Sequence, residues 1–238
     1  MDNNSNAVRG GIVVRYRSKR YRKSLEKYDC QKKYSVEEAA DIVRKMEPPK
    51  FVETVQVAVL LGLDARRQQI RGAFSLPNGI GKEKKVIVFA EGDQAKEAEA
   101  AGALEVGGQD LVKKVADGWT DFDVAVAHPA MMRFVGRLGK VLGPQGKMPT
   151  PKSGTVTEHV GDAVREFRAG KIEFRNDKGG NVHAPVGKLD FPSEKLAGNI
   201  TAFLDHLKSL KPPQTKGTFI QRASLSSTMS PGIKLIIH

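Results

Sequence analysis

The sequence predicts a protein of mixed α/β and α+β class, in which an α/β domain is inserted into a discontinuous α+β domain. Three observations lead to this prediction. Strand patterns that alternate apolar and polar residues occur near both chain ends, whereas the middle of the chain has continuous apolar runs. Helix and strand signals alternate regularly only in that middle part. The net charge of +12 is carried by the outer parts alone.

The first outer part reads as one helix followed by two strands. Residues 35–47 have apolar residues on one helical face, and Ser35 and Glu38 have the spacing of a capping box. The runs "ETVQVAVLLG" and "QIRGAFSL" then alternate as strands do. Such alternation is typical of an antiparallel sheet that is buried on one face only.

The middle part reads as alternating strands and helices. The runs "KVIVFA" and "DVAVA" are continuously apolar, as in strands that are buried on both faces of a parallel sheet. The helical segments "GDQAKEAEAAG" and "QDLVKKVADG" both end in glycine, which is frequent at helix C-termini. This part is therefore predicted to be an α/β domain.

The last part of the chain again has strand patterns that alternate apolar and polar residues. "KIEFRND", "NVHAPVG", "GTFIQRASL" and "GIKLIIH" are predicted strands, and "SEKLAGNITAFLDHLKSL" is a predicted amphipathic helix whose apolar face includes Leu196, Phe203 and Leu210. The simplest division makes residues 35–78 and 171–238 one split domain and residues 79–170 the insert, after a basic extension of residues 1–34.

The distribution of charge agrees with this division. Basic and acidic residues number 16 and 9 in residues 1–78, 13 and 13 in 79–170, and 10 and 5 in 171–238. A strongly basic protein favours a polyanionic partner, nucleic acid above all, and the excess charge points to the split domain as its binding site. A single cysteine and the lack of a long apolar run are typical of a cytoplasmic protein that does not cross a membrane.

The basic extension has two interpretations. Residues 15–34 hold nine Lys or Arg, two acidic residues and all four tyrosines. Such a run is either a solvated tail or an arm that becomes ordered on RNA, with cations on phosphates and tyrosines stacked on bases.

No catalytic or cofactor motif is complete. The run "LGPQGKMPTPKSG" lacks the glycine spacing and the Ser or Thr of a P-loop, and "LPNGIGKEKK" lacks the third glycine of a dinucleotide fingerprint. The five histidines are scattered, so no metal site is expected. An enzyme that acts on RNA or nucleotides through the insert is the alternative hypothesis.

Six blocks resemble the large-subunit ribosomal protein L-one family. They are, in chain order, "KFVETVQVAVLLGLD", "IRGAFSLPNGIGK", "VGGQDLVKKVADGWTDFD", "LGKVLGPQGKMPTPKSGTV", "GKIEFRNDKGGNVHAPVGK" and "STMSPGIKL". The resemblance implies a split domain joined through a hinge to a Rossmann-like insert of three layers. We place the hinge at Gly79 and Gly170, because glycine tolerates backbone changes.

The resemblance also implies a function without a cofactor. Members belong to the mobile stalk beside the tRNA exit site of the ribosome, where the split domain binds large-subunit rRNA and the stalk is linked to release of deacylated tRNA. In bacteria the same site binds a similar structure in the protein's own messenger RNA and represses its translation.

The resemblance assigns the RNA site to two short segments of the split domain. These are Lys50, Phe51, Glu53 and Thr54 before and in the first strand, and Thr228, Met229, Ser230 and Pro231 near the end. Ser230 stands where the family commonly has glycine. The alternative is that Phe51 and Met229 belong to the core.

A third segment has two interpretations. Lys178, His183 and Lys188 lie in "NDKGGNVHAPVGK", which either contacts RNA or is a solvated hairpin.

Overall fold

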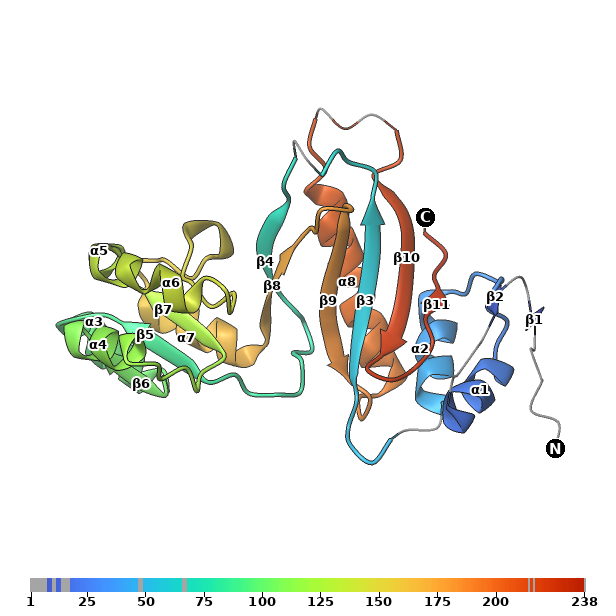
Figure 1. Cartoon of the computed structure of the whole chain (residues 1–238), viewed down its shortest axis with the longest axis horizontal. Helices are drawn as coiled ribbons and strands as arrows, with labels where there is room; N and C mark the ends of the chain where they lie inside the picture. Colours follow the sequence, from blue (N-terminus) through green and yellow to red (C-terminus); the bar gives the residue numbers. More distant parts are fainter. Residues whose placement is uncertain are drawn as a thin grey trace. The chain divides into compact units, whose positions relative to one another are not determined.

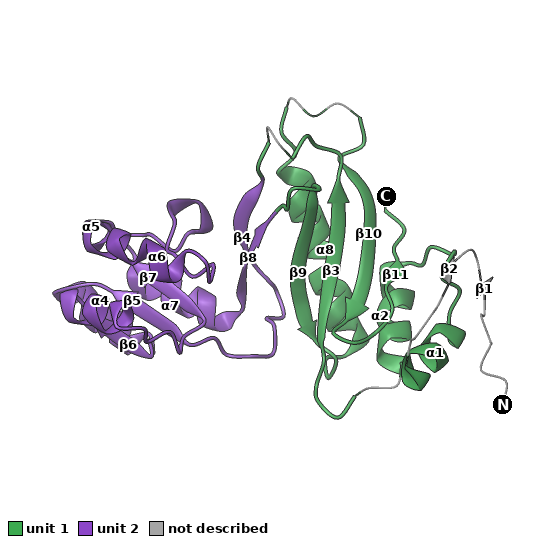
Figure 2. Ribbon diagram, in the orientation of Figure 1, with its two compact units in different colours: residues 1–69, 176–238 green, residues 70–175 purple. Residues whose placement is uncertain are grey.

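The chain forms two compact units, each described here by itself (Figure 2). Unit 1 comprises residues 1–69 and 176–238, and unit 2 comprises residues 70–175. The computed structural model describes residues 8–9, 12–13, 18–46, 49–65, 68–213, 215 and 217–237. Within these residues, no helix is both long and apolar enough to span a bilayer.

Unit 1 contains a four-stranded antiparallel sheet in the order β11-β10-β3-β9 (Figure 1). Its elements are β1 (Val8–Arg9), β2 (Ile12–Val13), α1 (Lys19–Glu26), α2 (Val36–Lys45), β3 (Thr54–Leu61), β9 (Asn181–Lys188), α8 (Ser193–Ser209), β10 (Ile220–Ser227) and β11 (Ile233–Lys234). Figure 1 shows α2 and α8 on one face of this sheet. The predicted mixed class and the predicted elements of both outer parts are therefore present.

The apolar pattern explains the core of unit 1. In β3 the side chains of Val55, Val57, Val59 and Leu61 are buried, while the residues between them are partly or fully exposed. Helix α2 begins with the predicted capping box, in which Ser35 and Glu38 bond each other's backbone N–H. This sheet is therefore amphipathic, with one face in the core.

The prediction that Leu210 lies on the buried face of α8 is wrong. Leu196, Ile200, Phe203 and Leu207 of α8 are fully buried, but Leu210 is 36% exposed. The helix ends at Ser209, so Leu210 is its C-cap and no longer follows the helical face.

Residues 18–34 pack on unit 1 rather than forming a free tail. The Arg20 guanidinium donates to the carbonyl of Met229 (2.8 Å), and the Tyr28 hydroxyl donates to the carbonyl of Gly232 (3.1 Å). Tyr34 forms a parallel bridge with Leu235. Burial also raises the pKa of the Tyr28 hydroxyl. The solvated-tail interpretation is therefore wrong for this segment, and residues 15–17 lie outside the described residues.

Unit 2 contains a parallel three-stranded sheet, in the order β6-β5-β7, and the separate antiparallel pair β4-β8. Its strands are β4 (Arg71–Ser75), β5 (Val86–Phe89), β6 (Glu105–Gly107), β7 (Val124–Ala127) and β8 (Lys171–Arg175). Its helices are α3 (Asp93–Ala100), α4 (Gln109–Ala116), η1 (Pro129–Met131), α5 (Met132–Val135), η2 (Gly136–Leu138), α6 (Gly139–Leu142), η3 (Pro151–Ser153) and α7 (Val160–Ala169).

Helices cover both faces of the parallel sheet. Ile87 and Phe89 of β5 pack in one core with residues of α4 to α6, and Val86 and Val88 pack in the other with residues of α3 and α7. The predicted three layers and the parallel strands are therefore observed.

The unit boundaries differ from the predicted domain boundaries. The cuts predicted at 78/79 and 170/171 both fall inside unit 2, because β4 and β8 pair with each other and are grouped with the insert. An alternating pattern indicates that a segment is a strand, but it does not specify the partner strand. That the units are separate domains stays a prediction.

Candidate nucleic-acid interface

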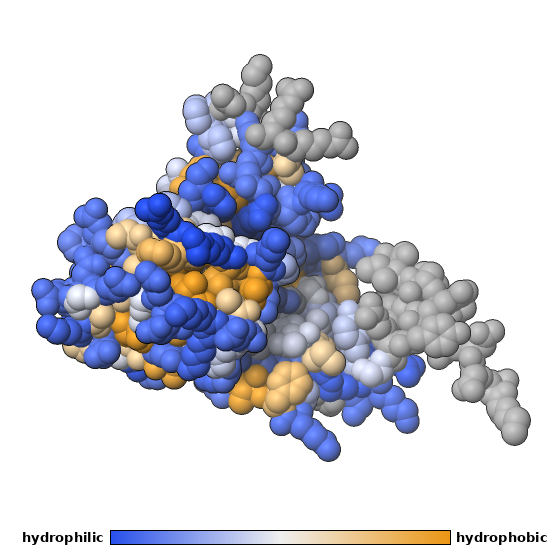
Figure 3. Space-filling model, turned by 60° about the vertical axis from the view of Figure 1, so that its left-hand side comes forward, coloured by the Kyte–Doolittle hydropathy of each residue, from blue (hydrophilic) through white to orange (hydrophobic). Residues whose placement is uncertain are grey.

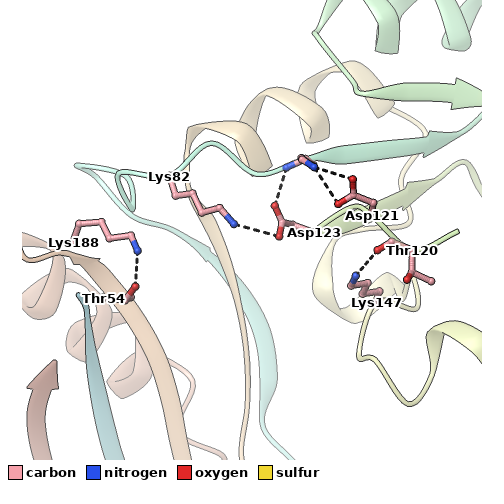
Figure 4. A network of polar contacts seen from close by, with 8 residues as sticks. Thr54, Lys82, Thr120, Asp121, Asp123, Lys147 and Lys188 are labelled. Carbon is pink, nitrogen blue, oxygen red and sulfur yellow. Dashed lines mark hydrogen bonds and ion pairs between the residues drawn. The ribbon is translucent and has the colours of Figure 1, made fainter. Parts of the chain in front are cut away.

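Three predicted site residues meet at one end of the sheet of unit 1. The Thr228 hydroxyl accepts from the Thr54 backbone N–H (3.1 Å) and donates to the Thr54 carbonyl (3.3 Å). The Lys188 ammonium donates to the Thr54 hydroxyl (2.7 Å), as Figure 4 shows. These bonds join the ends of β3, β9 and β10, so the polar groups have fixed positions.

Glu53 links the segments that meet at this end of the sheet through hydrogen bonds. Its side chain is only 2% exposed, and its carboxylate accepts from the Ser227 hydroxyl and from the Met229 backbone N–H (3.0 Å). Its carbonyl accepts from the N–H of Leu189 (3.0 Å). We therefore infer that Glu53 positions the site rather than contacting RNA.

Two predicted site residues expose large apolar side chains beside these polar groups. Phe51 and Met229 are each 52% exposed, so the alternative that they belong to the core is wrong. Val52, which the sequence analysis did not single out, is 48% exposed. Lys50 is exposed as well. Exposed apolar residues grouped beside fixed polar groups are typical of a binding surface.

The turn that presents Met229 is closed by Ser230. The Ser230 hydroxyl accepts from the Ser227 N–H (2.8 Å) and donates to the Pro231 carbonyl (3.2 Å), and Pro231 is buried. Ser230 thus supports the turn through a side chain that glycine lacks. Arg20 of α1 bonds the Met229 carbonyl, a contact that crosses 209 residues of sequence and that no local pattern reveals.

The other two predicted contacts lie away from this end. His183 is exposed and pairs in register with Ala58, four residues along β3 from Thr54, which is roughly 13 Å. Lys178 lies in the turn before β9, beyond the opposite end of that strand. Asp177 accepts from the N–H groups of Gly179 (2.8 Å) and Asn181 (2.7 Å), and its bonds with Asn181 hold the pKa of its carboxyl below the ordinary value.

The two predicted hinge glycines lie against each other inside unit 2. Gly79 and Gly170 both have positive φ (66° and 119°), and a Cβ on Gly170 would lie 2.8 Å from the Gly79 Cα. Neither position therefore accommodates a larger residue without strain. The hinge itself stays a prediction.

Unit 2 has a polar cavity of about 270 Å³, near the start of β5 and β7. Its charged groups pair with one another: Lys85 with Asp121 (3.1 Å) and Lys82 with Asp123 (3.6 Å). Lys147 donates to the Thr120 carbonyl (2.9 Å). These exposed ion pairs neutralise the titratable groups, so the cavity does not favour the hypothesis of an enzyme.

Comparisons with known proteins identify the family. The profile of the ribosomal protein L1p/L10e family matches residues 43–231. The chain is 50% identical over 223 residues to the large ribosomal subunit protein uL1 of Thermus thermophilus, covering 92% of this chain and 97% of that protein. It is 52% identical over 221 residues to the protein of the same name from Lactiplantibacillus plantarum, covering 92% and 96%. The chain therefore belongs to the ribosomal protein L1p/L10e family, as its motifs predicted, and it is a ribosomal protein rather than an enzyme.

Proposed function

We propose that this chain binds large-subunit rRNA through the end of the unit 1 sheet formed by Thr54, Lys188 and Thr228. The single observation that supports this most is the exposure of Phe51 and Met229 beside these hydrogen-bonded side chains. Two large apolar side chains that are half exposed, in the segments next to Thr54 and Thr228, contribute little to the core of unit 1. A partner that covers them is the simplest reason for their position.

The geometry suits structured RNA. Proteins recognise an A-form helix through its shape, its phosphates and its 2′-hydroxyls, because its base edges are hidden in a deep groove. The Thr54 hydroxyl accepts from Lys188 and keeps its own hydrogen to donate, and the Lys188 ammonium supplies positive charge. Phe51 and Met229 would exclude water from these contacts, which strengthens hydrogen bonds.

The composition of the sheet supports the same partner. None of the strands β3, β9, β10 and β11 contains an acidic residue. The half-exposed face of the sheet carries Gln56, His183, Arg222 and Lys234. Strands without carboxylates do not themselves repel a phosphate backbone.

We further propose the finer roles that the family resemblance implies. The protein would work on cytoplasmic ribosomes, at the mobile stalk beside the tRNA exit site, and contribute to release of deacylated tRNA. The same end of unit 1 would bind a similar structure in its own messenger RNA and repress translation. Gly79 and Gly170 remain candidates for the hinge of the stalk.

Crosslinking in cell extract tests the partner directly. After ultraviolet irradiation, sequencing of the RNA attached to the protein should give large-subunit rRNA first and the protein's own messenger second. A variant with Phe51→Ala and Met229→Ala should lose most of both signals, because each residue contributes apolar contact of about 1 kcal/mol or more. The control Leu104→Ala removes an equally exposed apolar side chain from unit 2 and should leave both signals unchanged. Equal losses for the two variants would place the RNA site elsewhere.

A further inference from the structure

The charge of unit 2 is balanced overall, but it is not evenly spread. Residues 124–157 contain no Asp or Glu, and they contain five basic residues: Arg133, Arg137, Lys140, Lys147 and Lys152. The acidic residues of the unit lie before and after this segment. A neutral total therefore conceals a strongly basic stretch in the middle of unit 2.

Basic residues outside this stretch mostly pair with carboxylates. Ion pairs join acidic residues to Lys82, Lys85, Lys96, Lys113, Lys114, Arg165, Arg168 and Lys171. Among the described residues, Arg133, Arg137, Lys140 and Lys152 form neither an ion pair nor a hydrogen bond, and all four are exposed. Their charges are thus free to attract an anion from outside.

Three of these side chains lie along one face of a helical segment. The elements η1, α5, η2 and α6 follow one another without interruption from Pro129 to Leu142. Val135, Leu138 and Leu142 of this segment are buried against the parallel sheet. Arg133, Arg137 and Lys140 have the spacing i, i+4, i+7 and lie on the exposed side, along a line of roughly 10 Å.

Two glycines in the same segment are required neither by their backbone conformation nor by close packing. Gly136 and Gly139 have right-handed helical φ values of −53° and −54°, which any residue adopts. Apart from its chain neighbours and the backbone of its own helix, a Cβ at either position would meet no heavy atom of the described residues within 4 Å. Alanine is the more stable residue in a helix, so these glycines lower stability without relieving any clash. Glycine at such a place suits the close approach of an external partner to the backbone.

Figure 3 shows the face of unit 2 that is turned forward, with long hydrophilic side chains around an apolar area. Long cationic side chains on a surface bind extended polyanions without reading their sequence.

We propose that Arg133, Arg137 and Lys140, with Gly136 and Gly139 between them, form a second RNA-contact surface that binds the phosphate backbone. The inference rests on the proposed function in that its polyanion is RNA. It differs in mechanism, because the unit 1 site holds polar groups at fixed positions, whereas this surface offers unpaired charge.

The first test compares two triple variants of the full chain. Arg133→Gln, Arg137→Gln and Lys140→Gln remove three unpaired charges; Lys96→Gln, Lys113→Gln and Arg165→Gln remove three charges that are already paired. Affinity for rRNA is measured at several salt concentrations. The first variant should flatten the plot of log affinity against log salt by roughly two units, since each lost phosphate contact reduces the slope by about 0.7 to 0.9. The control variant should keep the wild-type slope. Equal slopes for both variants would overturn the proposal.

A second variant separates binding from folding. Gly136→Ala with Gly139→Ala should raise or preserve the unfolding midpoint and yet weaken RNA binding at least threefold. Unchanged binding would show that nothing approaches the backbone there.

Titration with random RNA of equal length distinguishes a failure of the second-surface proposal from a failure of the proposed function. A wild type that does not prefer rRNA to random RNA contradicts the proposed function alone, because the slope difference between the triple variants should persist on random RNA. A wild type that prefers rRNA while the triple variants behave alike contradicts only the second surface.

Discussion

The sheets of the two units differ in how much of them is covered. The parallel sheet of unit 2 has a hydrophobic core on each face, so most side chains of its central strand β5 and of β7 are buried. The antiparallel sheet of unit 1 has helices on one face and half-exposed residues on the other, and its strand ends carry Thr54, Lys188 and Thr228. A sheet that is covered on one face can therefore contact a partner with its own side chains. A sheet that is covered on both faces instead supports helices, whose side chains make such contacts.

This difference separates two kinds of binding. In unit 1 the polar groups are fixed by bonds between three strands, which suits recognition of one RNA shape. In unit 2 the exposed cations at Arg133, Arg137 and Lys140 sit on flexible stems, which suits attraction to any phosphate backbone. If the two units bind RNA in these different ways, substitutions in unit 1 and in unit 2 should affect stability and RNA affinity differently.

The largest effect is expected from a cavity in the core of unit 2. Leu138 is 2% exposed and packs against the sheet, so Leu138→Ala should lower the free energy of unfolding of unit 2 by about 2 to 5 kcal/mol. Under conditions in which unit 2 of this variant stays folded, affinity for rRNA should change little, since the proposed main site lies in unit 1 and Arg133, Arg137 and Lys140 are kept. Leu104→Ala, at a 52% exposed position of the same unit, is the control. Complete loss of rRNA binding when unit 2 alone unfolds would contradict the proposal that unit 1 carries the main site.

The next effect concerns the rigidity of the unit 1 site. Glu53→Ala leaves the Ser227 hydroxyl and the Met229 N–H without their buried acceptor, and should lower the free energy of unfolding by about 3 kcal/mol. Glu53→Gln keeps one acceptor oxygen and should cost less. Chemical denaturation measures both. A Glu53→Ala protein as stable as the wild type would contradict the positioning role.

Two lysines near opposite ends of β9 give a smaller and closely matched effect. Lys188 bonds Thr54 at the proposed site, whereas Lys178 lies beyond the opposite end of β9. Lys188→Gln should weaken rRNA binding about tenfold, and Lys178→Gln about threefold or less. Titration of both variants with the same rRNA fragment decides. Similar losses would mean that the site extends along the whole sheet or depends on net charge alone.

The sequence predicted the parts of the fold that depend on local pattern. The capping box of α2, the alternation in β3 and the continuous burial of β5 are all visible within a few residues. The pairing of β4 with β8 joins segments about a hundred residues apart, so a pattern could not assign those strands to a unit. The end of α8 at Ser209, which leaves Leu210 exposed, lies at a helix boundary that periodicity does not fix.

The sequence indicated the residues of the candidate site but not the contacts that they make. The motifs indicated Phe51 and Met229, and both are exposed. The burial of Glu53 and its bond to Met229 could not be predicted, because the contact crosses 176 residues of sequence. Nor could the basic run show that Arg20 bonds the Met229 carbonyl.

The central claim is that fixed polar groups at the end of the unit 1 sheet recognise one RNA, and Thr228 tests it most directly. Thr228→Val keeps the shape of the side chain but removes the hydroxyl that holds Thr54. Thr228→Ser keeps that hydroxyl, and Thr201→Val makes the same change at an exposed position on α8.

The measurement is the ratio of affinities for the rRNA fragment and for random RNA of equal length, at several salt concentrations. For Thr228→Val we expect a loss of about 1 to 3 kcal/mol on the rRNA fragment, almost none on random RNA and an unchanged salt slope. Thr228→Ser and Thr201→Val should behave like the wild type. An equal loss of affinity on both RNAs for Thr228→Val would contradict the account, because it would show that this end of the sheet does not distinguish one RNA from another.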